Sequence, residues 1–505
     1  MHTKFDPRRG LLLQRPLIPL LMLLSMFSWG LDAAAGKAQE ADKVPLNVVL
    51  LTLDDMGWGT SGVEGCKVPG VTPNIDRLAS QGKLFTHGYV MVPMCGPSRA
   101  ALLTGRYPHS SGMMGHGQQP PALWEEPTVK TPSLSSYLHQ LGYRTGAILK
   151  NSRTAYLNTW DVTYDELPVG AGFHDRNPDS FYQRSKAFIV EAATLGQPFF
   201  LYANPIDPHD PWPDTDWERK ALDQYNPLNP YPAPERRYSR EEVDVPACLP
   251  DLPWVRENLV PYYESMHRGD ACIGAILQAI EDSGQADNTL VIFLSDNGMG
   301  VPGAKNTLYQ HGTRTPIIMK LPGVVEAGVV DDRSIVSAID LMPTILEACG
   351  LPPVERIEGR SIYDVLVGKK KQADRSYALT TFDYWGDSEA AQFYPQRSII
   401  NGRFCYIWNA YVQRSNGRKV MPMFWNDVLL SGNGKNKIAK DRIAYFKNRP
   451  VEEFFDLSRD PGCWNNLIDD KNYQEEITRF RAILKREMME SKDPERFIYH
   501  PESQK

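Results

Sequence analysis

Short runs of apolar, β-branched residues recur along the chain, and longer segments of helical character separate them. The runs that predict buried strands are 48–53, 145–149, 199–203 and 290–294. The helical segments between them include 73–82, 133–141 and 271–283. Because strands that alternate with helices bury a parallel sheet between helical layers, the pattern predicts an α/β fold with a mostly parallel sheet.

The pattern changes after a lysine run at 369–371. Segments 397–406 and 453–457 have strand character, and 475–488 has helical character. We therefore predict a catalytic domain over 44–368 and a smaller C-terminal α+β subdomain over 372–495. Segment 214–250 is rich in proline, tyrosine and charge, which predicts a long surface insertion of the kind that shapes substrate pockets.

The first forty residues have the pattern of a targeting segment. Arginines at 8, 9 and 15 precede an apolar run over 17–27, and alanines follow at 33–35. This order predicts a cleaved signal peptide over 1–36 and a secreted or periplasmic mature protein without membrane attachment. The alternative is a single membrane anchor, for which the apolar run is short. No N-x-[ST] sequon occurs, which favours a bacterial envelope over a eukaryotic secretory route.

Charge and cysteine content narrow the function classes. The formal net charge is −6 and no long basic block occurs, so nucleic-acid binding is excluded as the main role. An anionic substrate would need a local cationic cluster. The seven cysteines include no C-x-x-C pair, which argues against a zinc or redox motif. Setting Cys95 aside leaves an even number, and disulfide pairing stays open.

Polar residues collect directly after the predicted strands. They are Asp54, Asp55, Lys150, His209, Asp296 and Asn297. The carboxyl ends of strands in an open α/β sheet border the crevice where ligands bind, so we expect these side chains to converge. The aspartates and Asn297 offer hard oxygen ligands, which suit Ca²⁺ or Mg²⁺. The alternative for each is a turn-forming residue at a strand end.

Cys95 begins the most specific motif of the chain, Cys95-Gly96-Pro97-Ser98-Arg99, which an Ala-Leu run follows. A lone cysteine is most often a buried structural thiol. Here the proline and the helix-favouring run place Cys95 at a helix N-terminus, where backbone N–H groups favour an anion.

This motif, with the Leu-Thr-Gly at 103–105, resembles that of the type I, formylglycine-dependent sulfatases. Further similar stretches are 53–57, 72–78, 295–298 and 305–316, and the likeness extends over about 47–470. The resemblance implies an alkaline-phosphatase-like fold. It also implies that a formylglycine-generating enzyme oxidises Cys95 to formylglycine, which attacks sulfur and releases sulfate when the aldehyde reforms.

The resemblance also implies the site residues. Asp54, Asp55, residue 95, Asp296 and Asn297 would hold one Ca²⁺, with Mg²⁺ as the other option. Lys150, Lys305 and Arg99 would surround the sulfate oxygens, and His209 would protonate the leaving group. Alternatively, Arg99 holds the formylglycine and its helix in place.

Within the family the chain looks most like the heparan N-sulfatase (sulfamidase) branch. The similar stretches are 112–115, 198–202, 207–209, 394–398 and 455–461. They imply hydrolysis of N-sulfoglucosamine during heparan sulfate degradation. Arg397 could contact the sugar, although a structural ion pair fits it equally well, and the Trp and Tyr residues of 212–238 could supply aromatic surface.

Two positions depart from the family pattern. Ser152 stands where many sulfatases have a histidine that contacts the formylglycine, so another group must do its work. Lys305 agrees with the wider family, whereas the sulfamidase branch has arginine, which loosens the substrate assignment. Three alternatives therefore stay open: an O-sulfatase acting on another sulfated polysaccharide, a formylglycine-dependent phosphonate or phosphate monoester hydrolase, and an inactive carbohydrate-binding homologue.

Overall fold

A computed structural model describes residues 45–116, 132–150, 159–164, 175–225, 231–385, 392–414 and 436–500. The chain divides into Met1–Pro45 and the compact unit Leu46–Lys505, and the fold below is that of the second unit. The predicted signal peptide and Ser152 lie outside the described residues. None of the helices in the described ranges is long and apolar enough to cross a membrane.

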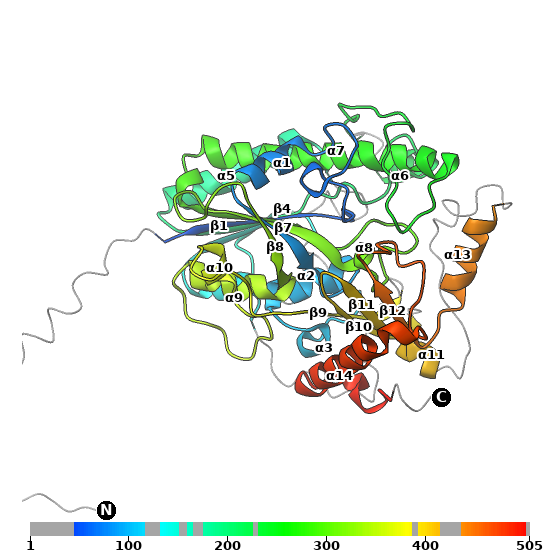
Figure 1. The fold of residues 1–505 in the computed structure, drawn as a ribbon. Helices are drawn as coiled ribbons and strands as arrows, with labels where there is room; N and C mark the ends of the chain where they lie inside the picture. Colours follow the sequence, from blue (N-terminus) through cyan, green and yellow to red (C-terminus); the bar gives the residue numbers. More distant parts are fainter. Residues whose placement is uncertain are drawn as a thin grey trace, which may run out of the picture. The chain divides into compact units, whose positions relative to one another are not determined.

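Within the described residues, eight strands form the central sheet (Figure 1). In spatial order they are β4 (Val162–Tyr164), β3 (Arg144–Ile148), β5 (Phe199–Ala203), β1 (Asn47–Leu53), β6 (Thr289–Ser295), β7 (Arg314–Lys320), β2 (Lys83–Tyr89) and β8 (Val329–Ser337). Only β7 runs antiparallel to its neighbours, β6 and β2. The prediction of an α/β fold with a mostly parallel sheet is confirmed.

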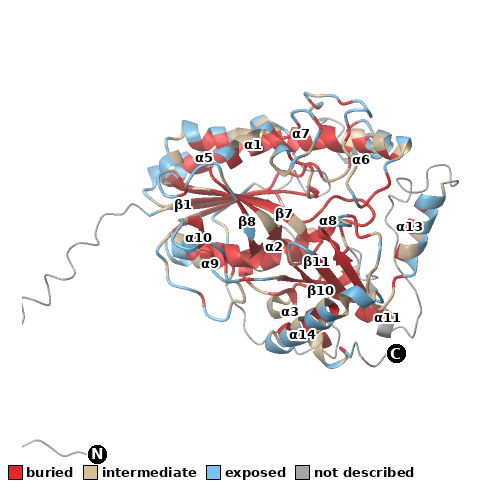
Figure 2. Ribbon diagram, in the orientation of Figure 1, coloured by how far each residue is buried: buried red, intermediate tan, exposed pale blue. Residues whose placement is uncertain are grey.

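The two faces of β1 bury into two separate cores. Val49, Leu51 and Leu53 belong to one apolar cluster, and Val48 and Leu50 belong to the other. This alternation follows from the two-residue period of a strand. Helices α1 (Pro73–Ser80), α5 (Pro178–Thr194) and α7 (Pro253–Asp282) cover one face, whereas α2 (Cys95–Thr104), α9 (Leu341–Ala348) and α10 (Tyr363–Leu366) cover the other. Figure 2 shows the strands between these layers as buried throughout most of their length.

A four-stranded antiparallel sheet follows, in the order β12 (Glu452–Asp456), β11 (Phe404–Trp408), β10 (Gln392–Ile400) and β9 (Ala378–Trp385). Helix α14 (Gln474–Glu490) packs against it. The two sheets thus lie on opposite sides of the lysine run at 369–371 in the sequence. We propose the boundary between 44–368 and 372–495 on this ground, although Leu46–Lys505 clusters as one unit.

Two predicted elements have different bounds in the structure. Segment 271–283 is only the end of α7, which starts at Pro253. Segment 397–406 spans parts of two strands, because β10 and β11 form a hairpin. The Asn401 side chain accepts hydrogen bonds from the backbone N–H groups of Arg403 and Phe404, which closes the turn. An Asn-Gly pair at 401–402 is a strong hairpin signal, so the single-strand prediction was wrong.

Six further α-helices lie in the described residues. They are α3 (Pro108–Ser111), α4 (Leu134–Gln140), α6 (Asp216–Tyr225), α8 (Gln310–Thr313), α11 (Ala410–Arg414) and α13 (Lys437–Lys447). Helix α6 lies in the predicted insertion 214–250. All seven cysteines fall in the described ranges, and each has a free thiol there.

Candidate active site

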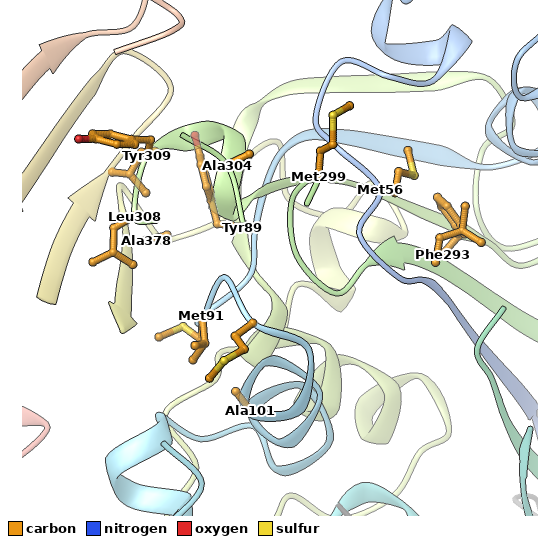
Figure 3. Close-up of a cluster of buried hydrophobic side chains, with 14 of the residues drawn as sticks. Met56, Tyr89, Met91, Ala101, Phe293, Met299, Ala304, Leu308, Tyr309 and Ala378 are labelled. Carbon is orange, nitrogen blue, oxygen red and sulfur yellow. The ribbon is translucent and has the colours of Figure 1, made fainter. Parts of the chain in front are cut away.

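Two neighbouring strand ends bring four oxygen-bearing side chains together. Strands β1 and β6 pair in parallel up to Leu53 and Ser295, so Asp54 and Asp55 emerge beside Asp296 and Asn297. All four side chains are at most 2% exposed. The chain then enters an apolar cluster, where Figure 3 shows Met56, directly after Asp55, and Met299, two residues after Asn297. The cluster anchors both ligand-bearing turns.

The chemistry of this group fits a hard divalent cation. Oxygens of Asp54 and Asp296 and the sulfur of Cys95 all lie within 4.8 Å of one another. Among the described residues, Asp54 Oδ1 and Asn297 Oδ1 are buried and have no hydrogen-bond partner. Buried oxygens of this kind are costly unless an ion or another donor satisfies them. Carboxylate and amide oxygens are the ligands of Ca²⁺ and Mg²⁺.

Three cations face the three carboxylates. Lys150 Nζ lies 2.6 Å from Asp54 Oδ2, and Lys305 Nζ lies 2.5 Å from Asp55 Oδ1. Arg99 pairs with Asp296 at 2.8 Å. Without an ion the charges of these six side chains cancel, so one divalent cation gives the site a net positive charge. Such a site attracts an anion although the whole chain is negative.

Burial and the neighbouring cations set the ionisation of the carboxylates. Burial acts to raise the pKa of Asp54, but Lys150, His209 and Arg99 together hold that pKa well below its usual range. Burial raises the pKa of Asp55, against the opposing effect of Lys305. The two adjacent carboxylates thus differ because their cationic neighbours differ.

Arg99 is held at nearly every position of its guanidinium. Its Nε donates to Asp296 Oδ2 at 2.9 Å. Its Nη1 donates to Thr52 Oγ1 at 2.6 Å, to Asn204 Oδ1 at 2.6 Å and to Tyr202 Oη at 3.0 Å. These hydrogen bonds of Nε and Nη1 tie α2 to the ends of β1, β5 and β6. The geometry therefore favours the holding role of Arg99 over direct contact with substrate.

Cys95 is the first residue of α2, as the motif predicts. The free N–H groups of a first helical turn and the helix dipole both favour negative charge at this point. Burial raises the pKa of the Cys95 thiol, so the unmodified side chain is neutral at neutral pH. A neutral thiol is a poor nucleophile and a poor metal ligand. Its Sγ lies 3.6 Å from His116 Nε2.

His209 reaches the same group from the segment after β5. Its Nε2 lies 4.0 Å from Asp55 Oδ2, and its Nδ1 lies 2.6 Å from the carbonyl oxygen of Asp210. Because that carbonyl only accepts, Nδ1 carries the hydrogen and Nε2 faces the site. Burial lowers the pKa of His209 to about 4, with a further lowering by Lys305 and Lys150. The ring is therefore neutral at neutral pH until an anion binds beside it.

A buried arginine fixes the backbone around His209. Arg176 donates to the carbonyl oxygens of His209 at 3.1 Å and Asp210 at 3.3 Å, and it also pairs with Asp207. Trp212 Nε1 donates to the carbonyl oxygen of Pro208 at 2.8 Å. These contacts hold three successive carbonyls, so the position of the histidine does not depend on its own side-chain contacts alone.

We expect Arg176→Gln to lower kcat about tenfold to a hundredfold with a folded protein, because small displacements of a catalytic group are costly. Arg184, which pairs with Asp175 at 3.1 Å, is the matched control, and Arg184→Gln should keep wild-type kcat. Steady-state kinetics and thermal denaturation of both variants test this. A folded Arg176→Gln enzyme with kcat within twofold of wild type would refute the positioning role.

Arg397 lies away from this cluster. It is 0% exposed and pairs with Asp383 at 2.7 Å and with Asp493 at 2.5 Å. Burial raises the pKa of Asp383 to about 7, although Arg397 acts against this rise. The geometry favours the ion-pair alternative for Arg397 over contact with a sugar.

Removal of the Arg397 charge leaves two buried carboxylates without their partner. We expect Arg397→Gln to lower the free energy of unfolding by about 3–5 kcal/mol. Arg479→Gln is the control, since the exposed Arg479–Glu476 pair should contribute about 1 kcal/mol or less. Denaturant unfolding measures both. A raised KM with unchanged stability in Arg397→Gln would instead assign it to substrate binding.

The aromatic residues of the insertion are mostly turned inward. Trp212 and Tyr238 are each 7% exposed, and Trp212 packs edge-on against Tyr262 at 5.5 Å. Trp217 on α6 is 49% exposed. The prediction that this segment offers its aromatic side chains as a sugar-binding surface therefore does not hold for Trp212 and Tyr238, because both side chains are buried.

The structure brings together nearly all of the site residues predicted from the sequence. They are Asp54, Asp55, Cys95, Arg99, Lys150, His209, Asp296, Asn297 and Lys305. The sequence reasoning missed Thr52, Asn204, Arg176 and His116. Thr52 was detectable as a polar residue inside an apolar strand, and Asn204 as a polar residue directly after one. Nothing local marks Arg176 or His116.

Comparison with known proteins agrees with this geometry. The family model described as Sulfatase matches residues 46–351, more than half of the chain. A second model, N-sulphoglucosamine sulphohydrolase, C-terminal, matches 304–413. An ulvan-active sulfatase of Formosa agariphila is 28% identical over 89% of this chain and 76% of its own length. Human N-sulphoglucosamine sulphohydrolase is 29% identical over 89% of this chain and 91% of its own.

Solved structures share the fold at low identity. One, in complex with its substrate D-glucosamine-2-N,6-O-disulfate, superposes with a TM-score of 0.62 at 20% identity and covers 89% of this chain and 98% of its own. The phosphonate monoester hydrolase of Agrobacterium radiobacter superposes with a TM-score of 0.60 at 18% identity, over 88% of this chain and 96% of its own. At these identities the likeness shows the fold alone, which is the predicted alkaline-phosphatase-like architecture.

Proposed function

The chain belongs to the sulfatase family and is a hydrolase, and on that premise we propose that it removes the N-sulfate group of glucosamine in heparin-type saccharides. The match of 304–413 to the C-terminal model of N-sulphoglucosamine sulphohydrolase carries this choice of substrate. The similarity to the human enzyme over 89% of the chain supports it. Ulvan-active relatives of comparable identity act on a different glycan, which is why substrate needs a direct test.

We propose that Asp54, Asp55, Asp296 and Asn297 hold one Ca²⁺ or Mg²⁺ next to a formylglycine at position 95. When bound, this pair supplies a metal-activated hydroxyl nucleophile for attack on sulfur. The residues fit it: their oxygens converge, two of those oxygens lack other partners in the described residues, and Cys95 stands at the helix N-terminus.

The two lysines are proposed to bind the sulfate group. Each is tied to a carboxylate that would hold the metal, Lys150 to Asp54 and Lys305 to Asp55. A divalent cation held by these carboxylates would weaken both pairs and leave the ammonium groups available to an anion. Positive charge held in place before reaction stabilises the negative charge that develops on the sulfate oxygens.

His209 is proposed to protonate the leaving group. Its Nε2 faces the site, the carbonyl oxygen of Asp210 accepts from its Nδ1, and Arg176 holds its backbone carbonyl. A neutral ring cannot donate from Nε2, but a bound anion favours the imidazolium and so supplies the proton where it is needed. An amine leaving group is more basic than a phenol, so proton donation matters more for an N-sulfate than for an aryl sulfate.

A panel of N-sulfated and 2-, 3- and 6-O-sulfated glucosamine mono- and disaccharides tests the substrate, with free sulfate as the readout. We expect sulfate release from the N-sulfated members. His209→Ala should reduce that rate about 100-fold or more, and the rate on an activated aryl sulfate by less. Cleavage of an O-sulfate with the N-sulfate untouched would contradict the sulfamidase assignment and leave the sulfatase activity in place. Phosphonate or phosphate monoesters in the same panel test the remaining hydrolase alternative.

We propose that the protein acts outside the cytoplasm of a bacterium, after export and after modification of Cys95 by a formylglycine-generating enzyme. The arginines, the apolar run and the alanines within 1–36 support export. N-terminal sequencing of the mature protein checks the cleavage site.

A further inference from the structure

His116 contacts residue 95, whereas His209 faces the carboxylate of Asp55. It follows the Gly-Met-Met-Gly stretch at 112–115, and its Nε2 lies 3.6 Å from Cys95 Sγ. His209 Nε2 instead faces Asp55 Oδ2, at 4.0 Å. The two imidazoles therefore serve different atoms. One stands at the metal and leaving-group side, and the other stands at the side chain that becomes the nucleophile.

Gly96 leaves the space that the His116 ring occupies. A Cβ at this position would lie 2.5 Å from His116 Nδ1 and 2.8 Å from His116 Cε1, distances that real Cβ atoms do not adopt. It would also come within 3.2 Å of the Met113 side chain. Since α2 is fixed by the Arg99 network, the ring would have to move. The glycine at the second position of the motif is thus what allows a histidine to touch residue 95.

We propose that His116 is a catalytic residue that contacts the hydroxyl group of the modified residue 95 and removes its proton when sulfate is released. This rests on the proposed function, because it assumes formylglycine at position 95. It accounts for Ser152, the sequence position at which many sulfatases have a histidine for this contact. The chain supplies the imidazole from the segment after α3 instead.

Release of sulfate from residue 95 is an elimination. The free hydroxyl on the carbon of residue 95 gives its proton to His116 Nε2, and the electron pair of that O–H bond forms the C=O bond of the aldehyde. The bond from this carbon to the sulfate oxygen breaks, and sulfate leaves with the electron pair. His116 then returns the proton to water.

The variants that test this are His116→Ala, His116→Gln and Gly96→Ala, which moves the ring without removing it. His139→Gln is the control, because His139 is exposed and pairs with Asp161 at 3.2 Å. Each protein is produced with the formylglycine-generating enzyme, and the aldehyde content of the 95 peptide is measured first. Rapid mixing with nitrophenyl sulfate then follows phenol and sulfate release separately, normalised to aldehyde, and intact mass is recorded during turnover.

We expect His116→Ala and Gly96→Ala to release a burst of phenol stoichiometric with aldehyde and then to release sulfate about 100-fold or more slowly than wild type. Intact protein should carry the mass of one retained sulfate group. His139→Gln should match wild type. Wild-type sulfate release in the His116 variants, or equal slowing of phenol and sulfate with no retained mass, would overturn the proposal. A wild-type enzyme that contains aldehyde but releases sulfate from neither nitrophenyl sulfate nor N-sulfoglucosamine would refute the proposed function instead.

Discussion

Cys95→Ala is expected to abolish sulfate release, by about 10⁴-fold or more, and to leave the fold intact. Loss of a nucleophile removes the reaction path itself, and effects of this size are typical of such residues. The structural cost should be under about 1 kcal/mol, because Cys95 is only partly buried and its sulfur makes only a weak contact, at 3.6 Å, with His116 Nε2. The expected outcome therefore separates chemistry from folding.

Sulfate release and thermal denaturation of two variants measure this. Cys349→Ala is the matched control, since Cys349 is also a partly buried free thiol but lies at the C-terminus of α9 and is not one of the site residues. It should retain full activity. A Cys95→Ala protein that turns over any sulfated substrate at the wild-type rate would contradict a nucleophile at this position.

Asp296→Asn is expected to produce the second largest loss, at least about 100-fold in affinity for Ca²⁺ or Mg²⁺ and a comparable loss of activity at low metal concentration. The substitution keeps the shape of the side chain but removes one of three carboxylate charges. It also leaves the buried Arg99 guanidinium without its closest carboxylate, which lies at 2.8 Å. The stability of the metal-free protein should therefore fall as well.

Metal analysis and thermal denaturation with added Ca²⁺, Mg²⁺ or Zn²⁺ test this prediction. A metal ion that binds the folded state and not the unfolded state raises Tm. Added Ca²⁺ or Mg²⁺ should therefore raise the Tm of wild type and leave that of Asp296→Asn unchanged. Asp332→Asn is the control, because the Asp332 side chain is 76% exposed and pairs with the exposed Arg333. Stoichiometric zinc in the wild type, with no calcium or magnesium, would contradict the hard-cation site.

The parts of the site that follow from strand topology could be predicted from the sequence. Asp54 and Asp296 each come directly after an apolar run, and parallel pairing of those runs places them together without any knowledge of packing. Cys95 was identifiable for another reason. The proline, the Ala-Leu run and the arginine that follow it together predict a helix that begins at Cys95.

The remainder depends on tertiary packing. His116 contacts Cys95 from a loop, and its ring has room there only because Gly96 lacks a side chain. No local sequence pattern predicts this relation between two positions. Arg176 acts on His209 through backbone carbonyls, whose acceptors are the same at every residue. The sequence left two roles open for Arg397, sugar contact and an ion pair, and only its packing beside Asp493 favours the ion pair.

Mass spectrometry of the peptide that contains Cys95, from protein produced with a formylglycine-generating enzyme, tests the central claim most directly. The account predicts an aldehyde in place of the thiol, and sulfate release that rises in proportion to the aldehyde fraction across preparations. Full turnover by protein in which Cys95 remains a thiol throughout would contradict it.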